Sequence, residues 1–139
     1  MNTRPIRFYH QGQIQAVEGL PITTTVLQYL REHAACTGSK EGCAEGDCGA
    51  CTVLVGELDG EQLKLRNVNA CTQFLPTLDG KALLTVEDLG SAERLNPVQQ
   101  ALVECHGSQC GFCTPGFVMS LQACYERHGQ AGTRPDRQQ

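Results

Sequence analysis

The chain has 139 residues, of which 40% are hydrophobic and 19% are charged, a balance typical of one globular domain or two small ones. Its formal net charge is -4 and its 11 Lys and Arg residues form no run, which argues against nucleic-acid binding. No stretch is apolar enough to span a membrane, and the first residues carry no secretory signal. We therefore expect neither nucleic acid nor a membrane as a partner.

Cysteine is the unusual component of the composition. The chain has nine cysteines, an odd number, and several of them lie close together in the sequence. Disulfides are rare in the reducing cytoplasm, where clustered thiols more often bind metals or carry out redox chemistry. We expect a cytoplasmic protein whose cysteines serve metal binding.

The first strands are predicted in two hairpins. Apolar and polar residues alternate on either side of Gln11-Gly12, and again on either side of Asp59-Gly60, and both dipeptides are turn signals. A further strand is predicted at residues 83–86. Together these segments predict a small mixed sheet.

One helix and one long loop are predicted between the two hairpins. The threonines of residues 23–25 can cap a helix whose Val26, Leu27 and Leu30 fall on one face, and this helix ends before Gly38. Residues 38–50 contain four glycines and two cysteines and show no periodicity, which indicates a wrapped loop. Residues 1–89 are therefore predicted to form an α+β domain, a sheet grasping one helix.

Residues 90–139 are predicted to be helical. Asn96-Pro97 begins a helix over residues 97–106, because Asn caps helix starts and Pro suits the first helical position. Thr114-Pro115 begins another, and we expect Gly129 to end it. A cysteine-bearing loop joins the two helices.

The first cysteine motif has the spacing of a plant-type 2Fe-2S site. Four and then two residues separate Cys43, Cys48 and Cys51, and Cys71 follows after nineteen more. Gly42, Gly46 and Gly49 allow the loop to wrap and to turn its amides toward the sulfurs. The alternative is a structural zinc site, but zinc sites favour two C-x2-C pairs and this loop has one.

Residues 41–60, around this motif, contain five acidic residues and no basic residue. They are interpreted either as a solvated rim or as groups that tune the cluster potential or dock a partner. The five residues are Glu41, Glu45, Asp47, Glu57 and Asp59.

A second cysteine pair, Cys110 and Cys113, immediately precedes the predicted helix start at Thr114. Its C-x-x-C spacing alone is a weak signal, compatible with a redox-active dithiol or with half of a second cluster site. The other cysteines, Cys36, Cys105 and Cys124, are expected to be small core residues. The four histidines are expected to cap elements or face solvent.

These motifs together resemble the molybdenum hydroxylase family, and within it most closely the small subunits of xanthine dehydrogenases. The resemblance is carried by residues 38–53 (GSKEGCAEGDCGACTV), 69–71 (NAC) and 109–116 (QCGFCTPG). It implies a plant-ferredoxin-like β-grasp domain followed by an all-α, four-helix-type domain, each with one 2Fe-2S cluster. It also implies that electrons pass from a molybdopterin centre, where purines are hydroxylated, through the clusters to FAD and NAD.

By the same resemblance, Gln109 would contact the pterin, and the partners would be a molybdopterin-binding large subunit and an FAD domain of the same subunit. The family carries a C-x-C pair further along, which would lie beyond Gln139. We therefore expect the helical domain, residues 90–139, to be incomplete, with one cluster in this chain and two in the full subunit. We also expect no substrate turnover by this chain alone.

Two other functions remain open at this stage. One is a freestanding ferredoxin-like electron carrier. The other is the small subunit of a different molybdenum hydroxylase, acting on aldehydes or N-heterocycles.

Overall fold

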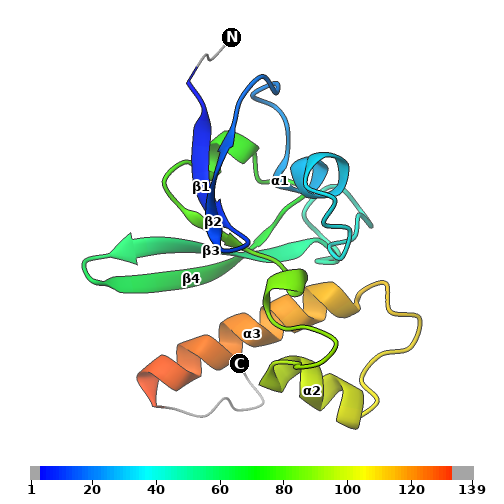
Figure 1. Cartoon of the computed structure of the whole chain (residues 1–139). Coiled ribbons are helices and arrows are strands. Elements are labelled where there is room, and N and C mark those ends of the chain that lie inside the picture. The colour runs from blue at the N-terminus through cyan, green and yellow to red at the C-terminus, as the bar shows by residue number, and fades with distance from the viewer. Residues whose placement is uncertain (1–3, 133–139) are drawn as a thin grey trace.

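A five-stranded mixed sheet forms the upper part of the computed structural model, which describes residues 4–132 (Figure 1). The strand order is β2-β1-β5-β3-β4. Neighbouring strands are antiparallel except β1 and β5, which are parallel. The strands are β1 (Ile6–His10), β2 (Gln13–Val17), β3 (Thr52–Asp59), β4 (Gln62–Asn69) and β5 (Ala82–Leu84).

Both predicted hairpins are confirmed. Gln11 and Gly12 have φ values of 55° and 80° between β1 and β2, and Gly60 has a φ of 64° between β3 and β4. Such left-handed backbone matches the twist of the flanking strands. The strand predicted at 83–86 begins one residue and ends two residues earlier, at Ala82–Leu84. It ends there because Thr85 caps a short 3-10 helix, Val86–Asp88, and the Thr85 amide donates to the Asp88 carboxylate.

The predicted helix between the hairpins is α1 (Val26–Gln28), which continues as a wider π-helical turn, Tyr29–His33. Thr25 caps it as expected: its Oγ1 accepts from the Gln28 amide at 3.1 Å, and its own amide donates to the Gln28 side chain at 2.9 Å. The buried face packs on the sheet core beside Phe8. A second short 3-10 helix, Leu75–Leu78, is not foreseen from the sequence, and its two leucines are fully buried.

Residues 90–132 contain two α-helices, α2 (Pro97–Glu104) and α3 (Thr114–Ala131). Asn96 caps α2 as predicted. The expected stop at Gly129 is wrong: α3 continues to Ala131 and ends at Gly132, whose φ of 67° is the left-handed conformation that terminates helices. The chain is thus α+β, with the sheet first and the helices second.

Helix α3 lies across β3 and β4 on the opposite side of the sheet from α1 (Figure 1). Strand β3 is therefore buried on both faces. Val53 and Val55 face the α1 core, while Leu54 packs in a second core with Val118 and Met119 of α3. This explains the continuous apolar run in β3, because a strand covered on both sides has no solvent face.

Candidate iron-sulfur sites

The first cysteine loop, residues 38–50, has no helix or strand, as predicted, and lies between the π-helical turn and β3. Cys43 is half-buried and Cys48 is exposed within it, whereas Cys51 is only 2% exposed where β3 begins. Cys71 follows the end of β4. Because Thr52 of β3 pairs with Asn69 of β4, the sheet brings Cys51 and Cys71 together, and the Cys71 amide donates to the Cys51 sulfur at 3.4 Å.

Three backbone amides point at the sulfur of Cys43. The amides of Cys48, Asp47 and Glu45 donate to it at 3.3, 3.3 and 3.4 Å. These hydrogen bonds stabilise the thiolate and lower the pKa of the Cys43 thiol to about 6. The loop therefore presents Cys43 as a thiolate, the form that binds metal, at neutral pH.

Cys71 lies in the opposite electrostatic environment. Burial raises the pKa of its thiol to about 11, and hydrogen bonding with Cys51 and the nearby charges of Cys51 and Cys43 act in the same direction. The Cys48 amide, in turn, donates to the Cys43 sulfur at 3.3 Å. Amide-to-sulfur hydrogen bonds thus link Cys43 with Cys48 and Cys51 with Cys71.

Two pairs of thiols suit two irons better than one zinc ion. A zinc ion draws four ligands around one point, whereas each iron of a 2Fe-2S cluster takes two thiolates. The donor set and its inward amides fit a 2Fe-2S cluster.

The glycines of the loop serve two different purposes. Gly46 and Gly49 have φ values of 81° and 76°, the left-handed backbone expected from the sequence. Gly42 instead provides space, because a Cβ on it would lie 2.7 Å from the Cys48 sulfur. The glycines therefore shape the cradle around the sulfurs.

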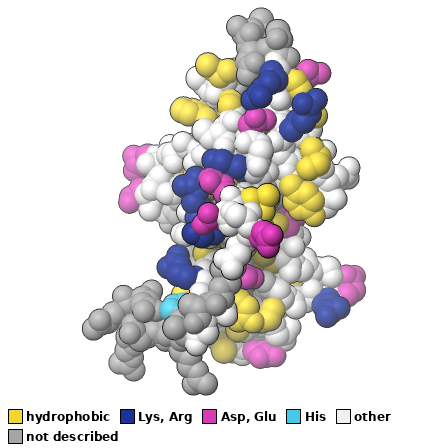
Figure 2. All heavy atoms as spheres, turned by 90° about the vertical axis from the view of Figure 1, so that its left-hand side faces the viewer, with side chains coloured by type: hydrophobic (Ala, Val, Ile, Leu, Met, Phe, Trp, Pro, Cys, Tyr) yellow, Lys and Arg dark blue, Asp and Glu magenta, His cyan; other side chains and the backbone are white. Residues whose placement is uncertain are grey.

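The acidic residues after Cys51 are offset by bases from elsewhere in the fold. Lys81 lies 3.0 Å and Arg66 3.3 Å from the Glu57 carboxylate, and Lys64 lies 2.6 Å from Asp59. Figure 2 shows basic and acidic side chains interleaved on the face toward which this hairpin points. The hairpin tip also extends away from the cysteine loop (Figure 1). Only three exposed acids remain on the loop itself: Glu41, Glu45 and Asp47.

The second cysteine pair lies in the loop that joins α2 to α3. Cys110 and Cys113 are exposed, and Cys113 is the residue just before the first turn of α3. With the exposed Gln109 they line a hollow of about 370 Å³, and no third cysteine is among the described residues that line it. The hollow brings the predicted pterin-contacting residue and both predicted thiolates to one surface.

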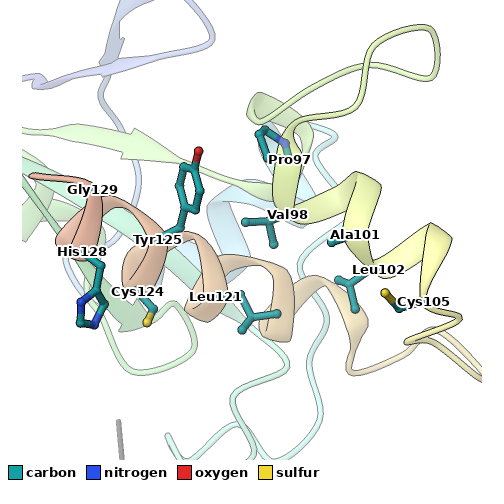
Figure 3. Close-up of a pocket in the computed structure, with 10 residues that line it drawn as sticks. All are labelled: Pro97, Val98, Ala101, Leu102, Cys105, Leu121, Cys124, Tyr125, His128 and Gly129. Carbon is teal, nitrogen blue, oxygen red and sulfur yellow. The ribbon is translucent and has the colours of Figure 1, made fainter. Parts of the chain in front are cut away.

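The other cysteines differ from their predicted role in part. Cys36 is 4% exposed in the α1 core, as expected, and Cys124 is half-buried. Cys105 is exposed, so its assignment to a core is wrong; it follows α2, where few neighbours cover it. Cys105 and Cys124 both line an apolar groove of about 720 Å³ between α2 and α3 (Figure 3).

The expectation that the histidines cap elements or face solvent is wrong for His10. Its side chain is 1% exposed, and Nε2 lies 3.3 Å from the Asp88 carboxylate. His10 lies two residues after the buried Phe8 in β1, and side chains two residues apart in a strand lie on the same face, so both face the core. That alternation is the signal in the sequence that could have placed it.

The mixed sheet, its crossing helix and the two thiol pairs define the class of the molecule as an α+β iron-sulfur protein. Two domain families match it: the 2Fe-2S iron-sulfur cluster binding domain at residues 8–75 and a second 2Fe-2S binding domain at residues 85–139. Xanthine dehydrogenase from Blastobotrys adeninivorans is 43% identical over 129 residues, 91% of this chain and 9% of that protein. Aldehyde oxidase 1 from Bos taurus is 43% identical over 124 residues, 87% of this chain and 9% of that protein.

Solved structures of related enzymes share this fold. The aldehyde oxidoreductase from Desulfovibrio gigas matches with a TM-score of 0.82 and 32% identity, over 96% of this chain and 14% of that one. Quinoline 2-oxidoreductase from Pseudomonas putida 86 matches with a TM-score of 0.72 and 28% identity, over 96% of this chain and 83% of that one. The chain belongs to the molybdenum hydroxylase family, as an iron-sulfur region of it. It spans about a tenth of the length of the curated relatives.

Proposed function

We propose that the chain is the electron-transfer portion of a xanthine dehydrogenase, passing electrons from a molybdopterin centre that hydroxylates purines toward FAD and NAD. The observation that carries this proposal is the grouping of two loop cysteines with Cys51 at the start of β3 and Cys71 after β4, together with three backbone amides that donate to the Cys43 sulfur. Similarity to xanthine dehydrogenases supports the purine assignment. Similarity to aldehyde oxidase 1 and to quinoline 2-oxidoreductase favours a second candidate, a hydroxylase of aldehydes or N-heterocycles.

The proposed first site is held by Cys43 and Cys48 on one iron and by Cys51 and Cys71 on the other. When bound, the 2Fe-2S cluster supplies one-electron chemistry, and its formal charge goes from -2 to -3 on reduction. The amides of Glu45, Asp47 and Cys48 then stabilise the added negative charge. The exposed acids of the loop act against this stabilisation.

The proposed second site has Cys110 and Cys113 as two of its four ligands, with Gln109 beside them to contact the pterin. The remaining ligands would come from outside the described residues. We therefore assign one cluster to this chain by itself and two to the complete subunit. The proposed division is a β-grasp domain over residues 1–89 and a domain of four-helix type that begins at residue 90.

The proposed partners are a molybdopterin-binding large subunit and an FAD domain of the same subunit. All nine cysteines are free, which supports a reducing location such as the cytoplasm. Within residues 4–132, none of the helices combines the length and the hydropathy that crossing a bilayer requires. The net charge of -4 supports the absence of nucleic acid from the partners.

Reconstitution with iron and sulfide under anaerobic conditions tests the first site. The chain should develop the visible absorption of a 2Fe-2S cluster, and C71A should lose it, because one iron then lacks a thiolate. C36A is the matched control: Cys36 is buried and its sulfur accepts from the Gln11 side chain at 3.2 Å, away from the cysteine loop, so the absorption should remain. Loss of absorption in C36A together with retention in C71A would contradict the ligand set, and purine turnover by the chain alone would contradict the assigned role.

A further inference from the structure

Two contacts join the first cysteine loop to the segment that holds the second cysteine pair, more than 50 residues away in the sequence. At one, the first turn of α3 lies on the first loop: a Cβ on Gly116 would be 2.1 Å from the Gly49 carbonyl oxygen and 3.1 Å from the Ala50 Cα. At the other, a Cβ on Gly42 would be 3.5 Å from Cε1 of Phe112. The first loop therefore meets the start of α3 through backbone, and it meets the second cysteine loop through one aromatic ring.

Phe112 occupies a particular place in this contact. It lies between Cys110 and Cys113 in the sequence, and a Cβ built on Gly42 would lie 3.5 Å from its Cε1 and 2.7 Å from the Cys48 sulfur, so the ring edge lies near both residues. Phe112 is 47% exposed, so its ring is partly covered. Phe112 thus belongs to the second site by sequence and borders the first site in space.

We propose that Phe112 is a positioning residue that couples the two sites. It holds the Cys110–Cys113 loop against the first loop and keeps water from one side of the Cys48 sulfur. The inference rests on the proposed function, because it requires a cluster at the first site. It concerns a residue that binds no iron itself.

The coupling has two consequences. Solvent exposure is one determinant of the potential of an iron-sulfur cluster, and water favours the more highly charged, reduced state. Removing the ring should therefore raise the reduction potential of the first site. In the other direction, loading the first site should order the first loop and, through Phe112, protect the amides of residues 110–113 from hydrogen exchange.

The test compares F112A, F112L and F117A in the full 139-residue chain reconstituted with iron and sulfide. Phe117 is the matched control, since it is an equally large, 61% exposed ring in the same segment that lines the hollow at Cys110 and Cys113. F112A should shift the reduction equilibrium by three- to tenfold, about 30 to 60 mV for one electron. F112L, which keeps an apolar cover, should restore most of the wild-type potential, and F117A should leave it unchanged.

Hydrogen exchange on the same proteins gives the second readout. Cluster loading should slow exchange at residues 110–113 in the wild type and in F117A, and not in F112A. If the cluster forms but F112A matches F117A in potential and in exchange, the coupling role is wrong while the proposed function stands. If no cluster forms in the wild type, the proposed function itself fails.

Discussion

The contact between α3 and the first cysteine loop predicts that Gly116 tolerates no side chain. In G116A the new Cβ would lie 2.1 Å from the Gly49 carbonyl oxygen and 3.0 Å from its carbonyl carbon. Both are backbone atoms between two loop cysteines and cannot rotate away as a side chain could. Either the first turn of α3 or the loop itself must move.

The size of the effect follows from two opposing contributions. Overpacking of this kind costs about 1–3 kcal/mol, and the rigid backbone obstacle places G116A toward the upper end. Replacing glycine by alanine in a helix returns up to about 1 kcal/mol. We expect a net loss of about 2 kcal/mol in the free energy of unfolding, or a fall in Tm of about 6–10 °C for a chain of this size.

Gly129 provides the matched control in the same helix. A Cβ there would meet nothing within 4 Å, so G129A should gain about 0.5 kcal/mol from helix propensity alone. Urea denaturation followed by far-UV circular dichroism measures both variants in the metal-free chain. If G116A is as stable as G129A, the close approach of α3 to the loop is wrong.

Two further predictions concern buried and activated groups. D88N should lower the free energy of unfolding by about 1–3 kcal/mol, because Asp88 contacts the buried His10 and accepts from the Thr85 amide at 2.7 Å. Burial raises the pKa of Asp88, but its contacts with His10 and Thr85 lower it by more, so the pKa in the folded protein is below 3.8. The stability that Asp88 contributes is therefore present at neutral pH and is lost as the pH falls below 3.8 and through the folded-state pKa. An acid limb as steep in D88N as in the wild type would contradict this. In the metal-free chain, iodoacetamide should alkylate Cys43 with a midpoint near pH 6, and a midpoint near an ordinary thiol value of about 8.5 would contradict the role of the three amides.

Local signals predicted most of the secondary structure. The hairpin turns at Gln11-Gly12 and Gly60 and the caps at Thr25 and Asn96 all depend on residues within a few positions of one another. The left-handed glycines Gly46 and Gly49 follow from the same local chemistry. These elements form where the sequence places them because neighbouring residues alone determine them.

Features that depend on long-range packing could not be predicted from the sequence. The burial of His10 depends on β5 and Asp88, which lie more than 70 residues away, and the neutralisation of Glu57 depends on Lys81. The spacing of Cys43, Cys48 and Cys51 indicated one shared site, but the approach of Phe112 to Gly42 could not be predicted, because no sequence pattern relates two loops that meet only through the packing of α3 on β3. The role of Cys110 and Cys113 as cluster ligands remains a prediction, because no third cysteine is among the described residues that line their hollow.

Cys43, Cys48, Cys51 and Cys71 are proposed to hold one 2Fe-2S cluster together. Electron paramagnetic resonance of the reconstituted chain after one-electron reduction, combined with iron and sulfide analysis, tests it most directly. We expect about two irons, two sulfides and one unpaired spin per chain, as in a single reduced 2Fe-2S cluster. Stoichiometric zinc with no sulfide and no paramagnetic signal would contradict it.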